Sequence, residues 1–276
     1  CHYMRAQGTD NGLGILFPAD SGAHSEKVHD GVLRYRFDYL PKKSWQTLAF
    51  ESGIPDNLFR HPLRFLQVPS FVKAFYQKAL EIAPHYDLLH AHWIIPGGLI
   101  GALLKVRYPQ LKLVLTIHSS DLWLIEKLPF GGKLFRWIFN QTDHVTLVSE
   151  QLKRRMERLL PVLTIAKQKN ITVVPMGIHW ESYQTKDREK KKKKAGLLGG
   201  KVILYLGRLI PLKGVSYLID AVKQMPHTHL VILGDGVERK KLERASTGSP
   251  WIHFLGNLQG QEKIDYLQIS DIAVFP

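Results

Sequence analysis

Short apolar segments that alternate with helical patterns constrain the fold of this chain more than any other feature. The second half contains four such segments, which are VILYLG (202–207), HLVILG (229–234), WIHFLG (251–256) and DIAVFP (271–276). The segments between them, VSYLIDAVKQM, ERKKLERA and QEKIDYLQIS, have the periodicity of helices. Strands that are apolar throughout are buried on both faces, and strands separated by helices form parallel sheets. We therefore expect an α/β fold with helices covering both faces of a parallel sheet.

The first half has a similar but less regular pattern. Strands are predicted at 13–19, 32–40, 87–93, 112–119, 144–149 and 171–177, and helices at 62–83, 97–107, 131–141 and 150–160. A polar, lysine-rich stretch at 179–200 separates the two sets. The chain of 276 residues is long enough for two domains. We expect Rossmann-like domains at 1–178 and 201–276, joined by a linker at 179–200 and facing a cleft.

Composition limits the compartment and the class of protein. The single cysteine, Cys1, excludes a disulfide framework and a thiolate metal cluster, and it fits a reducing compartment. No apolar run reaches the roughly 18 residues that a membrane span needs, so a cytoplasmic protein is expected. The first residues, CHYMRAQGTDNG, contain no apolar segment typical of a signal peptide. We expect that this sequence begins and ends inside a longer protein.

The formal net charge of +14 favours anionic partners. Much of it is local, because KDREKKKKK (186–194) contains seven cations and two anions. We interpret this segment as a solvated helix face. A peripheral contact with an anionic membrane surface, at its inner face, is the alternative. Nucleic acid is not expected as a partner, because no recognised nucleic-acid motif accompanies the charge.

The stretch GRLIPLKG (207–214) combines the features of a phosphate site. Gly207 is expected at the end of a strand, and ligands of open parallel sheets bind beyond the carboxyl ends of the strands. Arg208 follows at once, and Lys213 comes five residues later, before Gly214 opens a helix whose first amides are unpaired donors. Two cations at this spacing suit a diphosphate, and the competing interpretation is a surface loop with incidental charges.

Other nucleotide motifs fit poorly. The pattern G-x-x-x-x-G-K-[ST] of P-loop enzymes is absent from the sequence. LGDGVER (233–239) begins like the dinucleotide-binding pattern G-x-G-x-x-G, but Arg239 occupies the place of the third glycine. A dinucleotide-dependent dehydrogenase is therefore not favoured.

With these segments assembled, the chain resembles glycosyltransferase family 4, a family of retaining, nucleotide-sugar-dependent enzymes with the GT-B fold. The resemblance spans nearly the whole chain and depends on motifs that follow the order of the family: HAHW (90–93), TIHSSD (116–121), LVSE (147–150), VVPMGI (173–178), GRLIPLKG, LVILGDG, IHFLGN and DIAVFP. It implies two Rossmann-like domains that face a cleft, the second of them incomplete here. It also implies transfer of a hexose-type sugar from a UDP or GDP sugar to a hydroxyl acceptor, which is a lipid, a polysaccharide or a small molecule.

The resemblance assigns roles to residues of the second domain. Arg208 and Lys213 match the pair that holds the donor diphosphate and stabilises the departing nucleotide. Gly207 belongs to the same site, and Leu255 and Gly256 match the positions that contact the base. No cofactor and no metal ion are implied, because fixed cations can stabilise the charge that develops on the leaving phosphate.

In the first domain, the resemblance places His118 opposite the donor sugar as a catalytic residue. His92 and Trp93 are expected at the end of a strand, on the acceptor side, with Asp121 orienting a loop or contacting the acceptor. A metal site made of His90, His92, His118 and Asp121 is conceivable if the two strands are adjacent, but it is not favoured. His90 is expected to be a hydrogen-bonded histidine of the core.

The sequence departs from the family pattern at both ends. The family carries two glutamates that hold the donor sugar and ribose soon after the strand that matches DIAVFP, where this sequence stops. The first strand and glycine-rich loop of the family are expected to precede the start of this sequence. These 276 residues alone are therefore expected to be inactive. The alternatives are a nucleotide-sugar epimerase of the same fold, a non-catalytic nucleotide-binding module and, on charge alone, a nucleic-acid binder.

Overall fold

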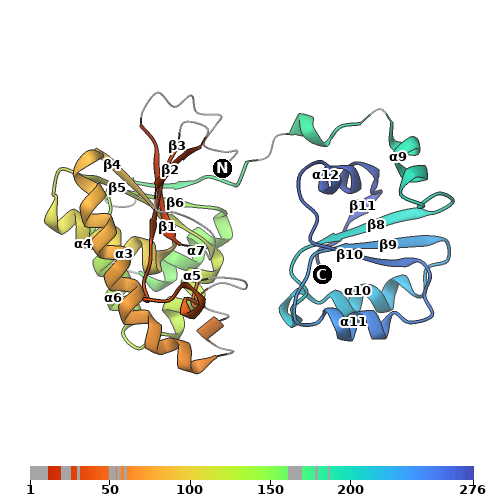
Figure 1. The fold of residues 1–276 in the computed structure, drawn as a ribbon, viewed down its shortest axis with the longest axis horizontal. Helices are drawn as coiled ribbons and strands as arrows, with labels where there is room; N and C mark the ends of the chain where they lie inside the picture. Colours follow the sequence, from red (N-terminus) through yellow and green to blue (C-terminus); the bar gives the residue numbers. More distant parts are fainter. Residues whose placement is uncertain are drawn as a thin grey trace. The chain divides into compact units, whose positions relative to one another are not determined.

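The protein divides into two compact units, Cys1–Gly177 (unit 1) and Ile178–Pro276 (unit 2). A computed structural model, drawn in Figure 1, provides the coordinates. It describes residues 12–19, 26–29, 32–49, 54, 57–58, 61–160, 170–177, 180–185 and 187–276. Each unit is an α/β structure with its own sheets and hydrophobic cores.

Unit 1 contains two sheets. The first has the strand order β1-β3-β2 and consists of β1 (Gly14–Pro18), β2 (Glu26–His29) and β3 (Val32–Phe37). β1 is parallel to β3, but β2 is antiparallel to β3. The sequence does not predict β2, because only Val28 of its four residues, EKVH, is apolar.

The second sheet of unit 1 is parallel throughout, as predicted. Its order is β4-β5-β6-β7, with β4 (Leu88–His92), β5 (Lys112–Ile117), β6 (His144–Leu147) and β7 (Ile171–Val173). The helical segments of unit 1 are η1 (Lys43–Trp45), η2 (Pro62–Gln67), α3 (Val68–Ile82), η3 (Ala83–His85), η4 (Trp93–Gly98), α4 (Leu99–Arg107), α5 (Ser119–Lys127), α6 (Gly131–Gln141) and α7 (Glu150–Leu159). α5 was not predicted, and it begins at Ser119, where the predicted strand 112–119 was expected to end.

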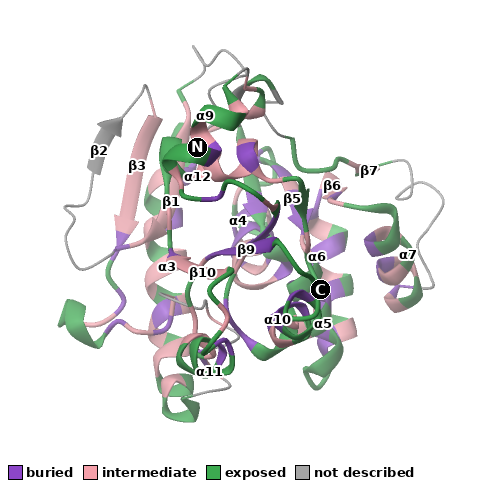
Figure 2. Cartoon of the chain, turned by 90° about the vertical axis from the view of Figure 1, so that its right-hand side faces the viewer, coloured by how far each residue is buried: buried purple, intermediate pink, exposed green. Residues whose placement is uncertain are grey.

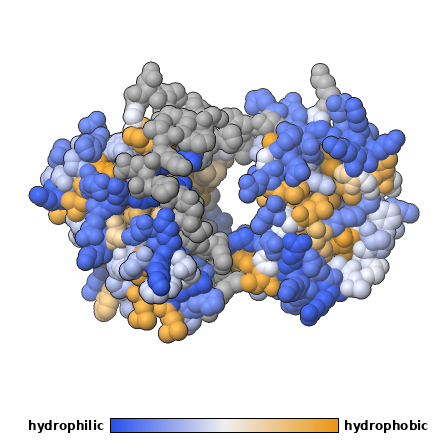
Figure 3. All heavy atoms as spheres, viewed as in Figure 1, coloured by the Kyte–Doolittle hydropathy of each residue, from blue (hydrophilic) through white to orange (hydrophobic). Residues whose placement is uncertain are grey.

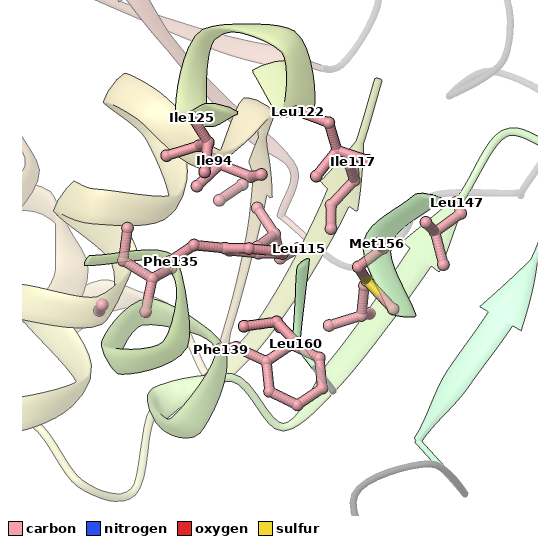
Figure 4. Packing of buried hydrophobic residues seen from close by; sticks show 14 of the residues in the cluster. Ile94, Leu115, Ile117, Leu122, Ile125, Phe135, Phe139, Leu147, Met156 and Leu160 are labelled. Carbon is pink, nitrogen blue, oxygen red and sulfur yellow. The ribbon is translucent and has the colours of Figure 1, made fainter. Parts of the chain in front are cut away.

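The main core of unit 1 lies on one face of this second sheet (Figure 4). Leu115 and Ile117 of β5 point to the same face of the sheet and are fully buried beside Leu147 of β6. Phe135 of α6 and Met156 of α7 cover them from the helical layer. Burying a side chain of this size stabilises the fold by roughly 1.5–3 kcal/mol, so this layer fixes the positions of the strand ends.

Unit 2 has one parallel sheet, with the order β10-β9-β8-β11. The strands are β8 (Lys201–Leu206), β9 (Thr228–Leu233), β10 (Ile252–Gly256) and β11 (Ile272–Ala273). The helical segments are η5 (Trp180–Tyr183), α9 (Arg188–Lys194), η6 (Pro211–Lys213), α10 (Val215–Val222), α11 (Arg239–Ala245) and α12 (Gly260–Ile269). β9 is buried along its whole length (Figure 2), with separate hydrophobic clusters on its two faces. The prediction of a sheet covered on both faces, made from the nearly continuous apolar strands, is therefore confirmed for unit 2.

The lysine-rich stretch is attached to unit 2 more closely than a free linker would be. α9 packs against α12, and its outer surface is largely hydrophilic (Figure 3). Arg188 Nη2 lies 2.8 Å from Asp271 Oδ1, and Lys191 Nζ lies 2.6 Å from Asp265 Oδ1. The Lys192 side chain is only 8% exposed, and its Nζ lies 3.2 Å from Asp271 Oδ2. Part of the lysine run is thus bound to the domain rather than solvated.

Candidate functional site

The carboxyl end of β8 presents Arg208 at the edge of the unit 2 sheet. The Gly207 amide donates to the Leu233 carbonyl at 2.9 Å and continues the ladder one residue past β8. The Tyr205 hydroxyl donates to the Arg208 carbonyl at 2.9 Å, which fixes the backbone where the chain leaves the sheet. The Arg208 side chain is exposed. A guanidinium held at this position can bind a phosphate in a forked geometry.

A pocket of about 230 Å³ opens at this strand end. Its lining consists of Leu206, Gly207, Arg208, Leu233, Gly234, Asn257, Leu258 and Lys263. Lys263 comes from α12 and is a second cation, which no local motif of the sequence indicates. Its side chain forms no hydrogen bond or ion pair with any described residue. The pocket combines apolar walls with two cations, which is a suitable lining for a nucleotide phosphate.

Glycines at the ends of β9 and β10 allow the backbone to close around this pocket. Gly234 has φ 141°, and a Cβ there would overlap the Gly207 carbonyl oxygen. The Gly234 amide donates to the Gly256 carbonyl at 2.7 Å. Together with the bond between Gly207 and Leu233, this contact ties the ends of β8, β9 and β10 into one rim. A side chain at Gly234 would disturb that rim.

Three predicted residues of unit 2 lie outside the pocket lining. Lys213 ends η6 and is exposed, next to Gly214, which has φ 60° and precedes α10. Leu255 packs against the hydrophobic cluster that contains Leu204 and Val231. Gly256 is buried, and its carbonyl is occupied by the Gly234 amide. The next two residues of the chain, Asn257 and Leu258, line the pocket instead. In the sequence, only their position directly after a strand indicates such a role.

The predicted residues of unit 1 come together at the carboxyl ends of β4 and β5. The parallel register pairs His92 with Thr116, so His118 lies just beyond the end of both strands. His92 Nδ1 is 3.2 Å from His118 Nε2, and the two rings are stacked with centroids 5.5 Å apart. Trp93 has φ 65° and is 49% exposed, with its ring centroid 5.8 Å from that of His118. These three rings form one aromatic surface.

Asp121 lies beneath this surface and does not face solvent. It is 3% exposed, and its Oδ2 accepts from the amides of Ile94 at 3.2 Å and His118 at 3.0 Å. Its Oδ1 accepts from the Leu122 amide at 3.2 Å. Burial raises the pKa of Asp121 to about 6, although these backbone hydrogen bonds lower it. The carboxylate therefore joins the ends of β4 and β5, which favours a positioning role over contact with an acceptor.

His90 is hydrogen-bonded, as predicted, but the prediction that it belongs to the core is wrong, because the residue is exposed. Its Nε2 lies 2.7 Å from Thr116 Oγ1, which in turn lies 2.6 Å from Thr146 Oγ1. Partial desolvation of the ring, with positive charge on His92 and His118, lowers the pKa of His90 to about 4. In the described part of the chain, no group of three or more His, Cys, Asp or Glu side chains is arranged to hold a metal ion.

Solved structures show a similar fold. The sucrose-phosphate synthase of Thermosynechococcus elongatus aligns with a TM-score of 0.71 and 18% identity, over 95% of this chain and 64% of its own. The Anabaena protein HepE, in complex with UDP and glucose, aligns with a TM-score of 0.63 and 20% identity, over 89% of this chain and 61% of its own. These likenesses show that the chain has the GT-B type of α/β fold.

Sequence comparisons give the family. An uncharacterized glycosyltransferase of Methanocaldococcus jannaschii is 25% identical over 267 residues, which are 95% of this chain and 70% of that protein. The chain spans about half the length of other curated relatives, 47% and 46% of two of them. The sequence model of Glycosyl transferases group 1 matches residues 187–276. That of Glycosyltransferase Family 4 matches residues 17–181, more than half of the chain. The chain therefore belongs to Glycosyltransferase Family 4.

Proposed function

We propose that the protein transfers a hexose-type sugar from a nucleoside diphosphate sugar to an acceptor hydroxyl, with retention of the anomeric configuration. The observation that carries this proposal is the pocket at the end of β8, where Arg208 and Lys263 line the same space. Strand ends of parallel sheets are the usual place for such ligands. Membership of Glycosyltransferase Family 4 supports the choice of a sugar donor.

The chemistry of transfer explains why cations are needed there. The acceptor oxygen forms a bond to the anomeric carbon, and the bond from that carbon to the diphosphate oxygen breaks. The acceptor proton passes to the leaving phosphate, on which negative charge develops. Arg208 and Lys263 stabilise this charge as fixed cations, and Lys213 of η6 is proposed as a third. This scheme uses no metal ion or other cofactor.

The donor is proposed to be of the UDP or GDP type. HepE, which shares the fold, was solved with UDP and glucose. In this scheme His118 of unit 1 contacts the donor sugar, and the exposed ring of Trp93 receives the acceptor. An exposed indole beside two imidazoles suits the apolar face of a sugar ring. The epimerase interpretation lacks a specific observation that favours it.

The acceptor is proposed to be a lipid, a polysaccharide or a small molecule, reached in the cytoplasm or at the inner face of a membrane. None of the helices in the described ranges is long and apolar enough to cross a bilayer. Lys190, Lys193 and Lys194 on α9 are exposed. Such a cluster would attract an anionic lipid surface by about 1 kcal/mol per lysine.

Calorimetric titration with UDP and GDP tests the donor site. Arg208→Ala should weaken binding roughly tenfold to a hundredfold, because a hydrogen bond to a charged group contributes about 1.5–3 kcal/mol. Arg244→Ala is a matched control, because Arg244 is exposed on α11 and does not line the pocket. Equal affinity of the wild type and Arg208→Ala for both nucleotides would refute the proposed site.

A further inference from the structure

His92 and His118 contact each other through one defined pair of nitrogens. His92 Nδ1 lies 3.2 Å from His118 Nε2, and the rings are tilted by only 25°. His92 also stacks on His90, with centroids 4.6 Å apart and planes 27° apart. The ring of His92 is thus held between two other imidazoles. Its other nitrogen, Nε2, has no hydrogen-bond partner among the described residues.

We infer that His92 is a positioning residue for His118, and that its Nδ1 fixes the ring orientation and the tautomer of His118. This inference rests on the proposed function for its meaning in catalysis, because it takes His118 as the residue that contacts the donor sugar. The geometry of the pair itself does not depend on that function. The role differs from the direct acceptor contact that the sequence indicates for His92.

The tautomers of two neutral imidazoles in contact are coupled. One of the two facing nitrogens must donate the proton and the other must accept it, because two lone pairs or two protons would repel. The His118 side chain also faces the Asp121 amide at the start of α5, which favours Nδ1 as its accepting nitrogen and Nε2 as the nitrogen that carries the proton. His118 Nε2 then donates to His92 Nδ1. Without this acceptor the His118 ring can turn and take the other tautomer, which changes what it offers to a ligand. Desolvation lowers the pKa of both rings, which keeps the pair neutral near pH 7.

The backbone on both sides of the pair is also fixed. The Asp121 carboxylate accepts from the amides of Ile94 and His118, so it joins the segment after His92 to the segment that carries His118. The relative position of the two rings is therefore set by the fold. The contact of His92 then selects one of the orientations that this backbone allows.

The two candidate roles of His92 use different nitrogens, and two substitutions separate them. The amide of asparagine lies near the position of Nδ1, and that of glutamine lies near Nε2. His92→Asn can therefore keep the contact with His118, whereas His92→Gln can keep an outward contact with an acceptor. His92→Phe keeps a stacked ring but has no nitrogen.

The first test needs no substrate. Long-range ¹H–¹⁵N spectra of the imidazoles in the full chain report the tautomer of His118. We expect one dominant tautomer in the wild type and in His92→Asn, and a mixture in His92→Phe and His92→Gln. His144→Phe is the control, because His144 bonds to Thr172 and not to His118. An unchanged His118 spectrum in His92→Phe would overturn the inference.

The second test measures transfer from UDP-glucose or GDP-mannose in the whole protein, because the 276 residues alone are expected to be inactive. Nucleotide affinity is measured in parallel. We expect His92→Phe and His92→Gln to lower kcat roughly tenfold, about the value of one hydrogen bond, with His92→Asn close to the wild type. Because His92 acts through His118, adding His92→Phe to His118→Ala should lower kcat no further. Rescue by His92→Gln instead of His92→Asn would overturn the inference and indicate acceptor contact. If the wild type binds no nucleotide, the proposed function is contradicted, but the spectral test of the contact between His92 and His118 remains valid.

Discussion

Replacing Asp271 with alanine should destabilise the edge of the unit 2 sheet. The Asp271 carboxylate accepts from the Val202 amide at 2.7 Å, from Lys192 Nζ at 3.2 Å and from Arg188 Nη2 at 2.8 Å. The Asp271 amide donates to the Val202 carbonyl at 2.8 Å. This residue thus connects α9, β8 and the start of β11. Its removal should loosen all three.

The expected size of the effect follows from the contacts. Desolvation raises the pKa of Asp271, but the hydrogen bond from the Val202 amide and the contacts with Arg188 and Lys192 outweigh it and lower the pKa to about 2. A shift of nearly two units from 3.8 corresponds to roughly 2.5 kcal/mol, and solvent screening of a side chain that is 22% exposed reduces this to about 1.5. This figure already includes the contact with Lys192, which is 8% exposed and loses this partner. We expect a loss of about 1.5–2.5 kcal/mol.

Hydrogen exchange and urea unfolding measure this loss. In Asp271→Ala, amides of β8 should exchange faster, and the urea midpoint of unit 2 should fall. Asp220→Ala is the matched control, because Asp220 is exposed on α10 and its side chain has no partner among the described residues. The pKa of Asp271 is lower in the fold, so its stabilisation is complete above the unfolded pKa near 3.8 and is lost as the pH falls through about 2. Unchanged β8 exchange in Asp271→Ala would refute this reasoning.

Further outcomes follow from the same structure. Lys263→Gln should weaken UDP binding about tenfold in calorimetry, because one charged contact is lost. Gly234→Ala should lower the free energy of unfolding by roughly 2–4 kcal/mol in urea titrations, because its Cβ would overlap the Gly207 carbonyl. The buried Asp121, with its pKa raised from 3.8 to about 6, should lower the stability of unit 1 as the pH rises from 4 to 6. His90, with its pKa lowered to about 4, should raise the stability over the same range, so Asp121→Asn should make the stability of unit 1 rise more steeply with pH. Replacing the exposed lysines of 190–194 with glutamine should leave UDP binding unchanged. If the protein binds liposomes in a salt-sensitive way and these substitutions abolish that binding, a membrane contact is favoured.

The sequence predicts the α/β layers well because local periodicity determines them. The short run 230–233 is apolar throughout, which predicts a strand covered on both sides, and β9 is such a strand. α6 occupies the predicted range 131–141. β2 and α5 were missed for the opposite reason, since their residues have weak periodicity and their positions depend on contacts with other segments. The predicted strand 271–276 shortens to two residues, and Phe275 beyond it is 68% exposed.

Candidate site residues were predictable where their position relative to a predicted strand already places them at the edge of the sheet. Arg208 directly follows a strand, so its place at the sheet edge follows from the strand prediction alone. Lys263 lies on a helix 55 positions further along the chain, and only the fold of α12 brings it to the same pocket. The contact between His92 and His118 likewise depends on the register of β4 and β5, which no local pattern specifies.

The lysine run shows how identical residues acquire different roles. A helix repeats every 3.6 residues, so positions 188, 191, 192 and 195 share one face of α9. Lys191 binds Asp265 of α12, and Arg188 and Lys192 bind Asp271, the residue before β11. Ala195 packs against the hydrophobic cluster below the helix. Lys190, Lys193 and Lys194 are exposed to solvent. Five consecutive lysines have no periodic pattern that would distinguish one from another. The packing of the helix against the domain decides which of them form ion pairs and which remain exposed.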